Sequence, residues 1–289
     1  MGVFRLATRG SPLARAQAAL AAEALHACGV PAVETVVIRT SGDREATTPV
    51  ERLAGEGWFS AALEVAVAEA RVEAAVHSAK DLPSRLRDGL GIAAFLERGD
   101  CRDGLVTRDG RGLDGLPAGA TVGTSSARRA AFLGALRPDL VVVPIRGNVD
   151  TRLRMLDTGA VEGLLLACAG LDRIGAAERV CERLDPRLFV PAPCQGAIAL
   201  ETAAGGPAAA SCAPADHAPT RAAAVAERAV LSALGGGCLL PLGAWAREEE
   251  GRLVLTAALE ADGRVRRAEL TGAIAAPEEL GARVAARLR

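Results

Sequence analysis

Polar and charged residues gather where predicted strands give way to helices, and a reactive site would form at such points. Thr124, Ser126, Arg128 and Arg129 follow a short strand and begin a helix. Hydroxyl groups, guanidinium groups and the free N–H groups of a helix start all bind anions. The ordinary alternative is a Ser/Thr helix cap beside solvated arginines. The cluster is therefore a candidate anion site that needs support from elsewhere in the chain.

The other strand-to-helix junctions carry the same residue types, at Arg9 and Ser11, at Arg146 and Arg152, and at Arg173. Open α/β sheets bind their ligands at the carboxyl ends of the strands. Surface salt bridges explain any one of these arginines, but they explain the set poorly. The set predicts a cleft for several carboxylates or phosphates.

A different chemistry is indicated by the segment 77–83, which follows a short buried strand. Lys80 is the only lysine of the chain, and it places a compact charge where other positions have the arginine fork. Asp81 is a candidate acid/base or cation-stabilising carboxylate, and the alternative is a structural pair with Lys80. His77 lies within the strand, which favours a buried, hydrogen-bonded imidazole over a catalytic one.

The seven cysteines form no C-x-x-C pair, so the sequence predicts neither a disulfide framework nor a metal site. Most of them are expected to be small buried hydrophobes. Cys238 differs because it follows three glycines after a helix. No Cys/His pairing is legible beside it, as a nucleophilic cysteine would need. A covalent tether for a cofactor needs only one accessible sulfur.

Composition limits the function classes. The formal charge is −1, half of the residues are apolar and 24% are charged, which is typical of a folded protein. Without a basic excess, binding to nucleic acid or to an anionic membrane is not favoured. The apolar stretches are too short for a membrane span, and no signal-peptide core is visible, so a cytoplasmic location is expected.

The elements that must position these residues alternate between strand and helix, which predicts α/β lobes with largely parallel sheets. Predicted strands cover 3–8, 33–39, 74–77, 90–95, 104–107, 121–123, 140–145, 163–167, 191–201, 253–259 and 264–270. Predicted helices cover 12–28, 61–72, a segment ending at Leu136, 149–156, 220–234 and 277–288. Residues 40–57 are predicted to form a loop, and residues 203–219 a linker.

Seven motifs in order resemble the porphobilinogen deaminase family, also called hydroxymethylbilane synthases. They are ATRGSPLA (7–14), AVHSAKDLP (75–83), VGTSSARR (122–129), RGNVDTRL (146–153), AGLDRIG (169–175), PAPCQGAIALE (191–201) and GGGCLLPLG (235–243). The chain departs from the common family pattern at Glu56, Gly235 and Leu239. The resemblance runs through nearly the whole chain.

The resemblance implies an α/β fold with two lobes like a type II periplasmic binding protein, plus a small C-terminal α+β domain. The implied boundaries are 1–97 with 197–214 for domain 1, 101–191 for domain 2, and 218–289 for domain 3. The third domain would carry the cofactor cysteine.

The resemblance also implies an activity, the condensation of four porphobilinogens with release of ammonia to give a linear tetrapyrrole. The primer would be a dipyrromethane joined to Cys238 by a thioether. Implied cofactor-binding residues are Lys80, Ser78, Asp81, Thr124, Ser126, Arg128 and Arg129. Implied substrate-binding residues are Arg9, Ser11, Arg146, Arg152, Arg173 and Gln195. Asp81 would be catalytic, stabilising the cation formed as ammonia leaves and helping with proton transfer. The protein is expected to be a monomer.

Two other functions remain open on the residues alone. A two-lobed anion-binding receptor would use the same arginines without catalysis, although Cys238 and the missing signal peptide argue against it. A thiol enzyme is a more distant alternative.

Overall fold

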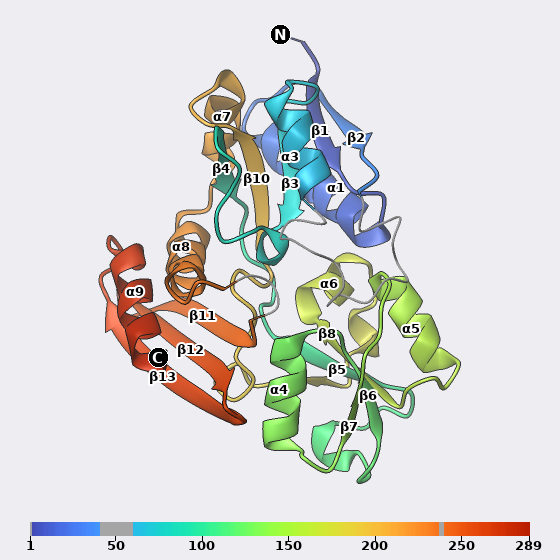
Figure 1. The fold of residues 1–289 in the computed structure, drawn as a ribbon. Coiled ribbons are helices and arrows are strands. Elements are labelled where there is room, and N and C mark those ends of the chain that lie inside the picture. Colours follow the sequence, from blue (N-terminus) through green and yellow to red (C-terminus); the bar gives the residue numbers. More distant parts are fainter. Residues whose placement is uncertain (1, 41–59, 237–239) are drawn as a thin grey trace. The chain divides into compact units, whose positions relative to one another are not determined.

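The computed structural model describes residues 2–40, 60–236 and 240–289. The chain forms two compact units, one of Met1–Gly99 with Ala197–Arg221 and one of Asp100–Gly196 with Ala222–Arg289 (Figure 1). It therefore leaves the first unit near residue 99 and returns to it at residue 197. The finer division into three domains, with the boundaries given above, stays a prediction. Most of the predicted loop 40–57 lies outside the described residues.

The first unit contains a five-stranded mixed sheet in the order β2-β1-β3-β10-β4. Its strands are β1 (Phe4–Thr8), β2 (Val33–Val37), β3 (Ala74–Ser78), β4 (Leu90–Phe95) and β10 (Ile198–Ala203). β1 runs parallel to β2 and β3, whereas β10 runs antiparallel to β3 and β4. The prediction of a largely parallel sheet therefore holds for one side of the sheet only.

Side-chain capping and backbone turns set where the helices of the first unit begin and end. In α1 (Pro12–Ala27) the Ser11 hydroxyl accepts a hydrogen bond from the Ala14 N–H at 3.2 Å, and Pro12 occupies the first turn. α3 (Ala61–Ala68) ends earlier than the predicted residue 72, because the chain turns at Ala70 with φ 52°. A short 3₁₀ turn, η2 (Ala79–Asp81), follows β3 directly.

The second unit contains a five-stranded sheet in the order β7-β6-β8-β5-β9. Its strands are β5 (Asp103–Thr107), β6 (Thr121–Gly123), β7 (Val141–Val143), β8 (Gly163–Ala167) and β9 (Glu182–Arg183). β6 is parallel to β7 and β8, and β5 is antiparallel to both of its neighbours. The two sheets thus share one strand order. In each sheet the fourth strand, β10 or β5, is antiparallel to both of its neighbours. Each of these two strands follows the point at which the chain passes from one unit to the other. Two α/β sheets with the same strand order agree with the two-lobed α/β fold that the family resemblance implied.

Three helices follow strands of this second sheet: α4 (Ala127–Leu136), α5 (Val149–Asp157) and α6 (Cys168–Arg173). Short 3₁₀ turns lie at Leu113–Gly115 and Ala177–Arg179. Each of the three helices begins at the carboxyl end of a strand, so each presents its N-terminus there.

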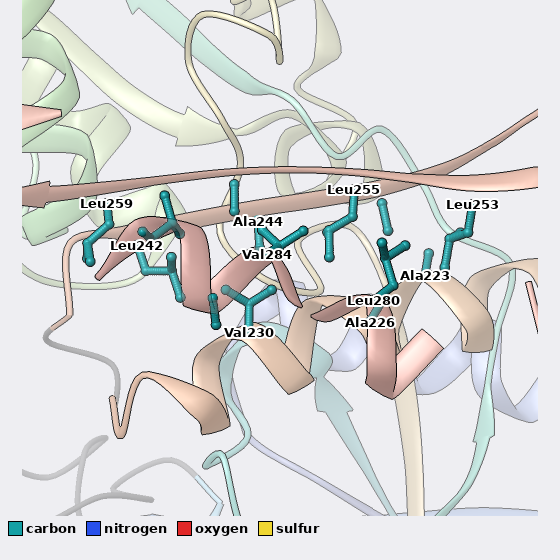
Figure 2. Close-up of a cluster of buried hydrophobic side chains, with 14 residues drawn as sticks. Ala223, Ala226, Val230, Leu242, Ala244, Leu253, Leu255, Leu259, Leu280 and Val284 are labelled. Carbon is teal, nitrogen blue, oxygen red and sulfur yellow. The ribbon is translucent and has the colours of Figure 1, made fainter. Parts of the chain in front are cut away.

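The C-terminal part is a three-stranded antiparallel sheet with two helices on one face (Figure 1). It comprises β11 (Leu242–Glu249), β12 (Arg252–Ala261), β13 (Arg264–Gly272), α8 (Ala218–Ala233) and α9 (Pro277–Leu288). Figure 2 shows leucines of the sheet pointing at alanine and valine side chains of the helices. A Cβ at Gly281 would lie 2.5 Å from the Ala226 carbonyl oxygen, so the close approach of α9 to α8 requires glycine there. The predicted small α+β domain is confirmed.

Two predictions about elements are wrong, and one long strand was missed. Residues 191–197 are not strand, because the chain turns at Cys194 (φ 61°) and Gly196 (φ 90°), and β10 begins only at Ile198. The predicted linker 203–219 contains α7 (Pro207–Cys212) and a 3₁₀ turn, Ala213–Ala215, and Cys212 is fully buried in the core of the first unit. β11 was not predicted at all.

No helix within residues 2–40, 60–236 or 240–289 is long and apolar enough to cross a bilayer.

Candidate functional site

The junction between β6 and α4 places four of the predicted anion-binding residues in one turn of chain. Ser126 caps α4, accepting a hydrogen bond from the Arg129 N–H at 3.4 Å. The Thr124 hydroxyl accepts one from the Ser126 N–H at 3.2 Å, and Thr124 is buried. The cap holds the helix start in register, so that Arg128 and Arg129 leave the first turn at fixed positions.

Arg128 and Arg129 are buried, only 3% and 6% exposed, and both meet Asp103 at the start of β5. Arg128 Nη1 lies 2.7 Å from Asp103 Oδ2, and Arg129 Nη2 lies 2.7 Å from Oδ1. Each guanidinium also donates to a backbone carbonyl, Arg128 to Val190 at 2.8 Å and Arg129 to Leu165 at 2.9 Å. The two side chains are therefore held from more than one side.

Electrostatics in this cluster follow from burial and from the imbalance of charge. Burial opposes ionisation of Asp103, but the guanidinium groups of Arg128 and Arg129 outweigh it and hold the pKa of the carboxyl below its ordinary range. Burial lowers the pKa of Arg128, and Asp103 opposes that shift. Two cations face one carboxylate, so the cluster keeps one net positive charge in surroundings that water does not screen.

Gln195 joins this cluster from the turn that precedes β10. Its Nε2 donates to the Cys101 carbonyl at 2.8 Å and to Asp103 Oδ1 at 3.1 Å, and the side chain is fully buried. Arg173, at the end of α6, donates from Nη2 to the Gly196 carbonyl at 2.5 Å. Burial lowers the pKa of Arg173. The turn at 194–196 thus brings two predicted substrate residues into one hydrogen-bonded region.

A second cationic junction lies between β7 and α5. Arg146 precedes the helix, and its buried Nη1 atom has no hydrogen-bond partner among the described residues. Arg152, in the first turn of α5, donates from Nε to the Gly147 carbonyl at 2.9 Å. Gly147 has φ 102°, and a Cβ there would lie 2.8 Å from Thr151 Cγ2, so only glycine fits. The junction carries two guanidinium groups on a backbone turn that glycine permits.

In the first unit, the predicted catalytic segment lies at the carboxyl end of β3. Ser78 is its last strand residue, Lys80 is half-buried within η2, and Asp81 is exposed at the end of that turn. Gln17 of α1 reaches this corner, donating from Nε2 to the Ser78 hydroxyl at 2.8 Å. The short turn therefore presents Asp81 to solvent directly after a buried strand.

His77 lies beneath this corner and is a buried structural residue, as predicted. Its Nε2 lies 3.0 Å from Glu201 Oε2 of β10, and both side chains are buried. The pair ties β3 to its antiparallel neighbour β10.

The remaining predicted residues fall at the end of β1 and outside the described chain. Arg9 follows β1 and is half-buried, and Ser11 caps α1. Cys238 lies outside the described residues. The structure thus gathers Arg9, Ser11, Ser78, Lys80 and Asp81 in the first unit. It gathers Thr124, Ser126, Arg128, Arg129, Arg146, Arg152, Arg173 and Gln195 in the second.

Comparison with known proteins decides the family. Residues 4–210 match the family description "Porphobilinogen deaminase, dipyromethane cofactor binding domain", and residues 222–289 match "Porphobilinogen deaminase, C-terminal domain". The chain belongs to the porphobilinogen deaminase family. The curated porphobilinogen deaminase of Acidothermus cellulolyticus is 46% identical over 295 residues, covering 100% of this chain and 89% of the relative. That of Mycolicibacterium gilvum is 46% identical over 298 residues, covering 99% and 95%.

The candidate site residues of both units lie within regions that match the porphobilinogen deaminase family. The family's cofactor-binding region, 4–210, contains every predicted site residue except Cys238, which falls within the C-terminal region at 222–289. The roles assigned to the individual residues stay predictions, because no comparison tests them one by one.

Two residues that hydrogen-bond to candidate site residues, Asp103 and Gln17, were missed by sequence reasoning. Asp103 carries a signal that could have found it: a lone acidic residue opens a strand whose remaining residues are apolar or small. A buried carboxylate needs a cation, although the sequence does not show which one. Gln17 had the weaker signal of an amide among alanines on the inward face of a helix.

Proposed function

We propose that this chain is a hydroxymethylbilane synthase, which condenses four porphobilinogen molecules head to tail and releases ammonia at each addition. The product is the linear tetrapyrrole hydroxymethylbilane. The observation that carries this conclusion is the similarity to porphobilinogen deaminases along nearly the full chain. A receptor without catalysis is not favoured by these relatives.

The residues of the second unit fit the dipyrromethane cofactor of the family. Each pyrrole carries an acetate and a propionate, so the cofactor is a polyanion that needs buried cations. Arg128 and Arg129 bring one net positive charge into a buried region, and the buried Arg128 Nε has no hydrogen-bond partner among the described residues. Bidentate guanidinium groups suit carboxylates. When bound, the cofactor supplies the pyrrole carbon from which the chain grows.

Cys238 would hold that cofactor by a thioether. Thr124, Ser126, Arg128, Arg129, Ser78, Lys80 and Asp81 would hold its polar groups. The incoming substrate also carries two carboxylates, and Arg9, Ser11, Arg146, Arg152, Arg173 and Gln195 would bind it. The buried Arg146 Nη1 has no hydrogen-bond partner in the described part of the chain, which supports a ligand at that junction, since a buried donor without a partner is costly.

Asp81 would act in the chemical step. Loss of ammonia breaks the carbon–nitrogen bond of the aminomethyl group, the bonding electrons leave with nitrogen, and a cation remains on the pyrrole. A carboxylate beside the pyrrole N–H stabilises that cation. After the new carbon–carbon bond forms, the attacking ring carbon loses a proton, and Asp81 would help to carry it. Its exposed position at the end of η2 supports access for a substrate.

The monomeric state and the cytoplasmic location belong to the same proposal. Neither nucleic acid nor a membrane is needed as a partner, because substrate and product are small polar molecules.

The purified chain should release ammonia from porphobilinogen and form one tetrapyrrole for every four molecules consumed. Cys238→Ser, which removes the proposed tether, should form no product above the uncatalysed rate. A folded, unmutated protein that binds porphobilinogen without releasing ammonia would contradict the proposal and favour a receptor.

A further inference from the structure

We propose that Asp103 is a positioning residue of the cofactor site: its carboxylate fixes the guanidinium groups of Arg128 and Arg129 in the arrangement that binds the carboxylates of the dipyrromethane. The inference rests on the proposed function, because it assigns a role within the site that the function requires.

Both oxygens of the Asp103 carboxylate are occupied. Oδ2 accepts from Arg128 Nη1 at 2.7 Å. Oδ1 accepts from Arg129 Nε at 2.8 Å and from Gln195 Nε2 at 3.1 Å, and Arg129 Nη2 lies 2.7 Å away. Asp103 belongs to β5 and is fully buried, whereas the arginines belong to α4. One buried carboxylate of β5 therefore joins three side chains from two other segments, α4 and the turn at 194–196.

A second set of bonds prevents the arginines from turning about this anchor. Arg128 Nη1 also donates to the Val190 carbonyl, so both hydrogens of that nitrogen are used. Arg129 Nη1 donates to the Leu165 carbonyl. The buried Arg128 Nε keeps a hydrogen with no acceptor among the described residues. Because Arg128 Nη1 is held by two acceptors, the Nε–H has a defined direction in which to meet an anion.

A counter-ion role and a positioning role for Asp103 predict opposite changes in anion binding when its carboxylate is neutralised. If Asp103 were only a counter-ion that competes with the ligand, its neutralisation would raise the net positive charge of the cluster and tighten anion binding. If Asp103 positions the arginines, its neutralisation frees two repelling guanidinium groups and weakens binding. The sign of the change distinguishes the two roles.

The test compares three variants with the unmutated chain. Asp103→Asn keeps the side-chain shape and removes the charge, and Asp103→Glu keeps the charge and displaces it by one methylene. Asp100→Asn is the matched control, because Asp100 also pairs with two arginines of the same unit, Arg102 at 2.7 Å and Arg183 at 2.5 Å. Neither of these arginines belongs to the proposed site.

Each protein is isolated without cofactor, incubated with increasing porphobilinogen, denatured, and weighed by mass spectrometry for the two-pyrrole increment. Urea unfolding is measured in parallel, so that loading is compared between folded proteins. We expect Asp103→Asn to need about tenfold more porphobilinogen for half-loading, the size expected for a lost hydrogen bond to a charged group. Asp103→Glu should also load less readily, although its charge is unchanged. Asp100→Asn should load as the unmutated chain does.

Normal or easier loading of folded Asp103→Asn would overturn the proposal while leaving the function intact. Normal loading of Asp103→Glu beside impaired Asp103→Asn would also overturn it, since charge alone would then suffice. If Asp103→Asn does not fold, Asp103→Glu decides. Recovery of both only as unfolded chains would assign Asp103 to the fold rather than to the site. Failure of the proposed function is distinguishable, because the unmutated chain would then gain no increment at all.

Discussion

The two strand ends that carry the proposed site residues differ in how their charged groups meet water. At the end of β3, Asp81 is exposed on a three-residue turn. At the end of β6, Arg128 and Arg129 are buried and bound to a fully buried carboxylate. A group that exchanges protons and meets successive substrates needs access, whereas groups that hold a permanent ligand benefit from being fixed and dry. The two strand ends therefore suit different proposed roles, reaction at the exposed carboxylate and anchoring at the buried arginines.

The same substitution at both corners should have opposite consequences, and the largest effect is expected at Asp81. Asp81→Asn should reduce turnover of porphobilinogen by about 10²–10⁴-fold, the usual contribution of a positioned acid/base group. Its free energy of unfolding should change by less than about 0.5 kcal/mol, because the residue is exposed. Steady-state ammonia release and urea unfolding measure the two quantities. Near-normal turnover would remove Asp81 from the mechanism.

Asp103→Asn, unlike Asp81→Asn, should lower the free energy of unfolding substantially. Removing one partner of a buried ion pair costs about 3–5 kcal/mol, so we expect a loss of that size in the free energy of unfolding. Asp100→Asn should lose less, because Asp100 is only partly buried. Urea unfolding of both variants at neutral pH makes the comparison, and equal losses would contradict the special role of the buried corner.

The pH dependence of that difference has a definite sign. The pKa of Asp103 is lowered in the folded chain, so its stabilisation is present above the unfolded pKa, about 3.9, and disappears as the pH falls below it. The difference between the unmutated chain and Asp103→Asn should therefore be constant from pH 8 to pH 5 and shrink below about pH 4. A difference that vanishes near pH 6 would contradict the lowered pKa.

The smallest effect is expected at Gln17, which supports the β3 corner from α1. Gln17→Ala removes the hydrogen bonds with Ser78 at 2.8 and 3.1 Å. The loss in the free energy of unfolding should be about 1 kcal/mol, the net value of a typical hydrogen bond. Ser211→Ala, which removes an exposed hydrogen bond to Pro207 in the same unit, is the control and should lose less. Equal losses would mean that the corner needs no such support.

The sequence predicted the elements whose signals are local. α9 has the predicted bounds, since Pro277 opens it and its apolar spacing is regular. β11 was missed because its first residues are Leu, Gly and Ala, which have little strand character apart from the partner strand β12. The segment of α7 was predicted to be a linker because Pro207 and the alanines that follow it resemble flexible chain. The structure shows instead that the helix is held by its buried Cys212.

The sequence motifs selected candidate site residues but not their environment. Motif resemblance selected Arg128 and Arg129, and the N-cap at Ser126 could be foreseen from residue type. The burial of both arginines could not, because it depends on Asp103, which is 25 residues from Arg128 in sequence. The hydrogen bond of Gln195 to Asp103 spans 92 residues and was equally invisible. Long-range pairing of buried charges is set by the fold and has no local signal.

Whether the chain carries a two-pyrrole primer on one sulfur can be read from the intact mass of the denatured protein. We expect a mass higher than that of the polypeptide by two linked pyrrole units, and no such increment in Cys238→Ser. An unmodified polypeptide mass after incubation of the folded chain with porphobilinogen would contradict this expectation.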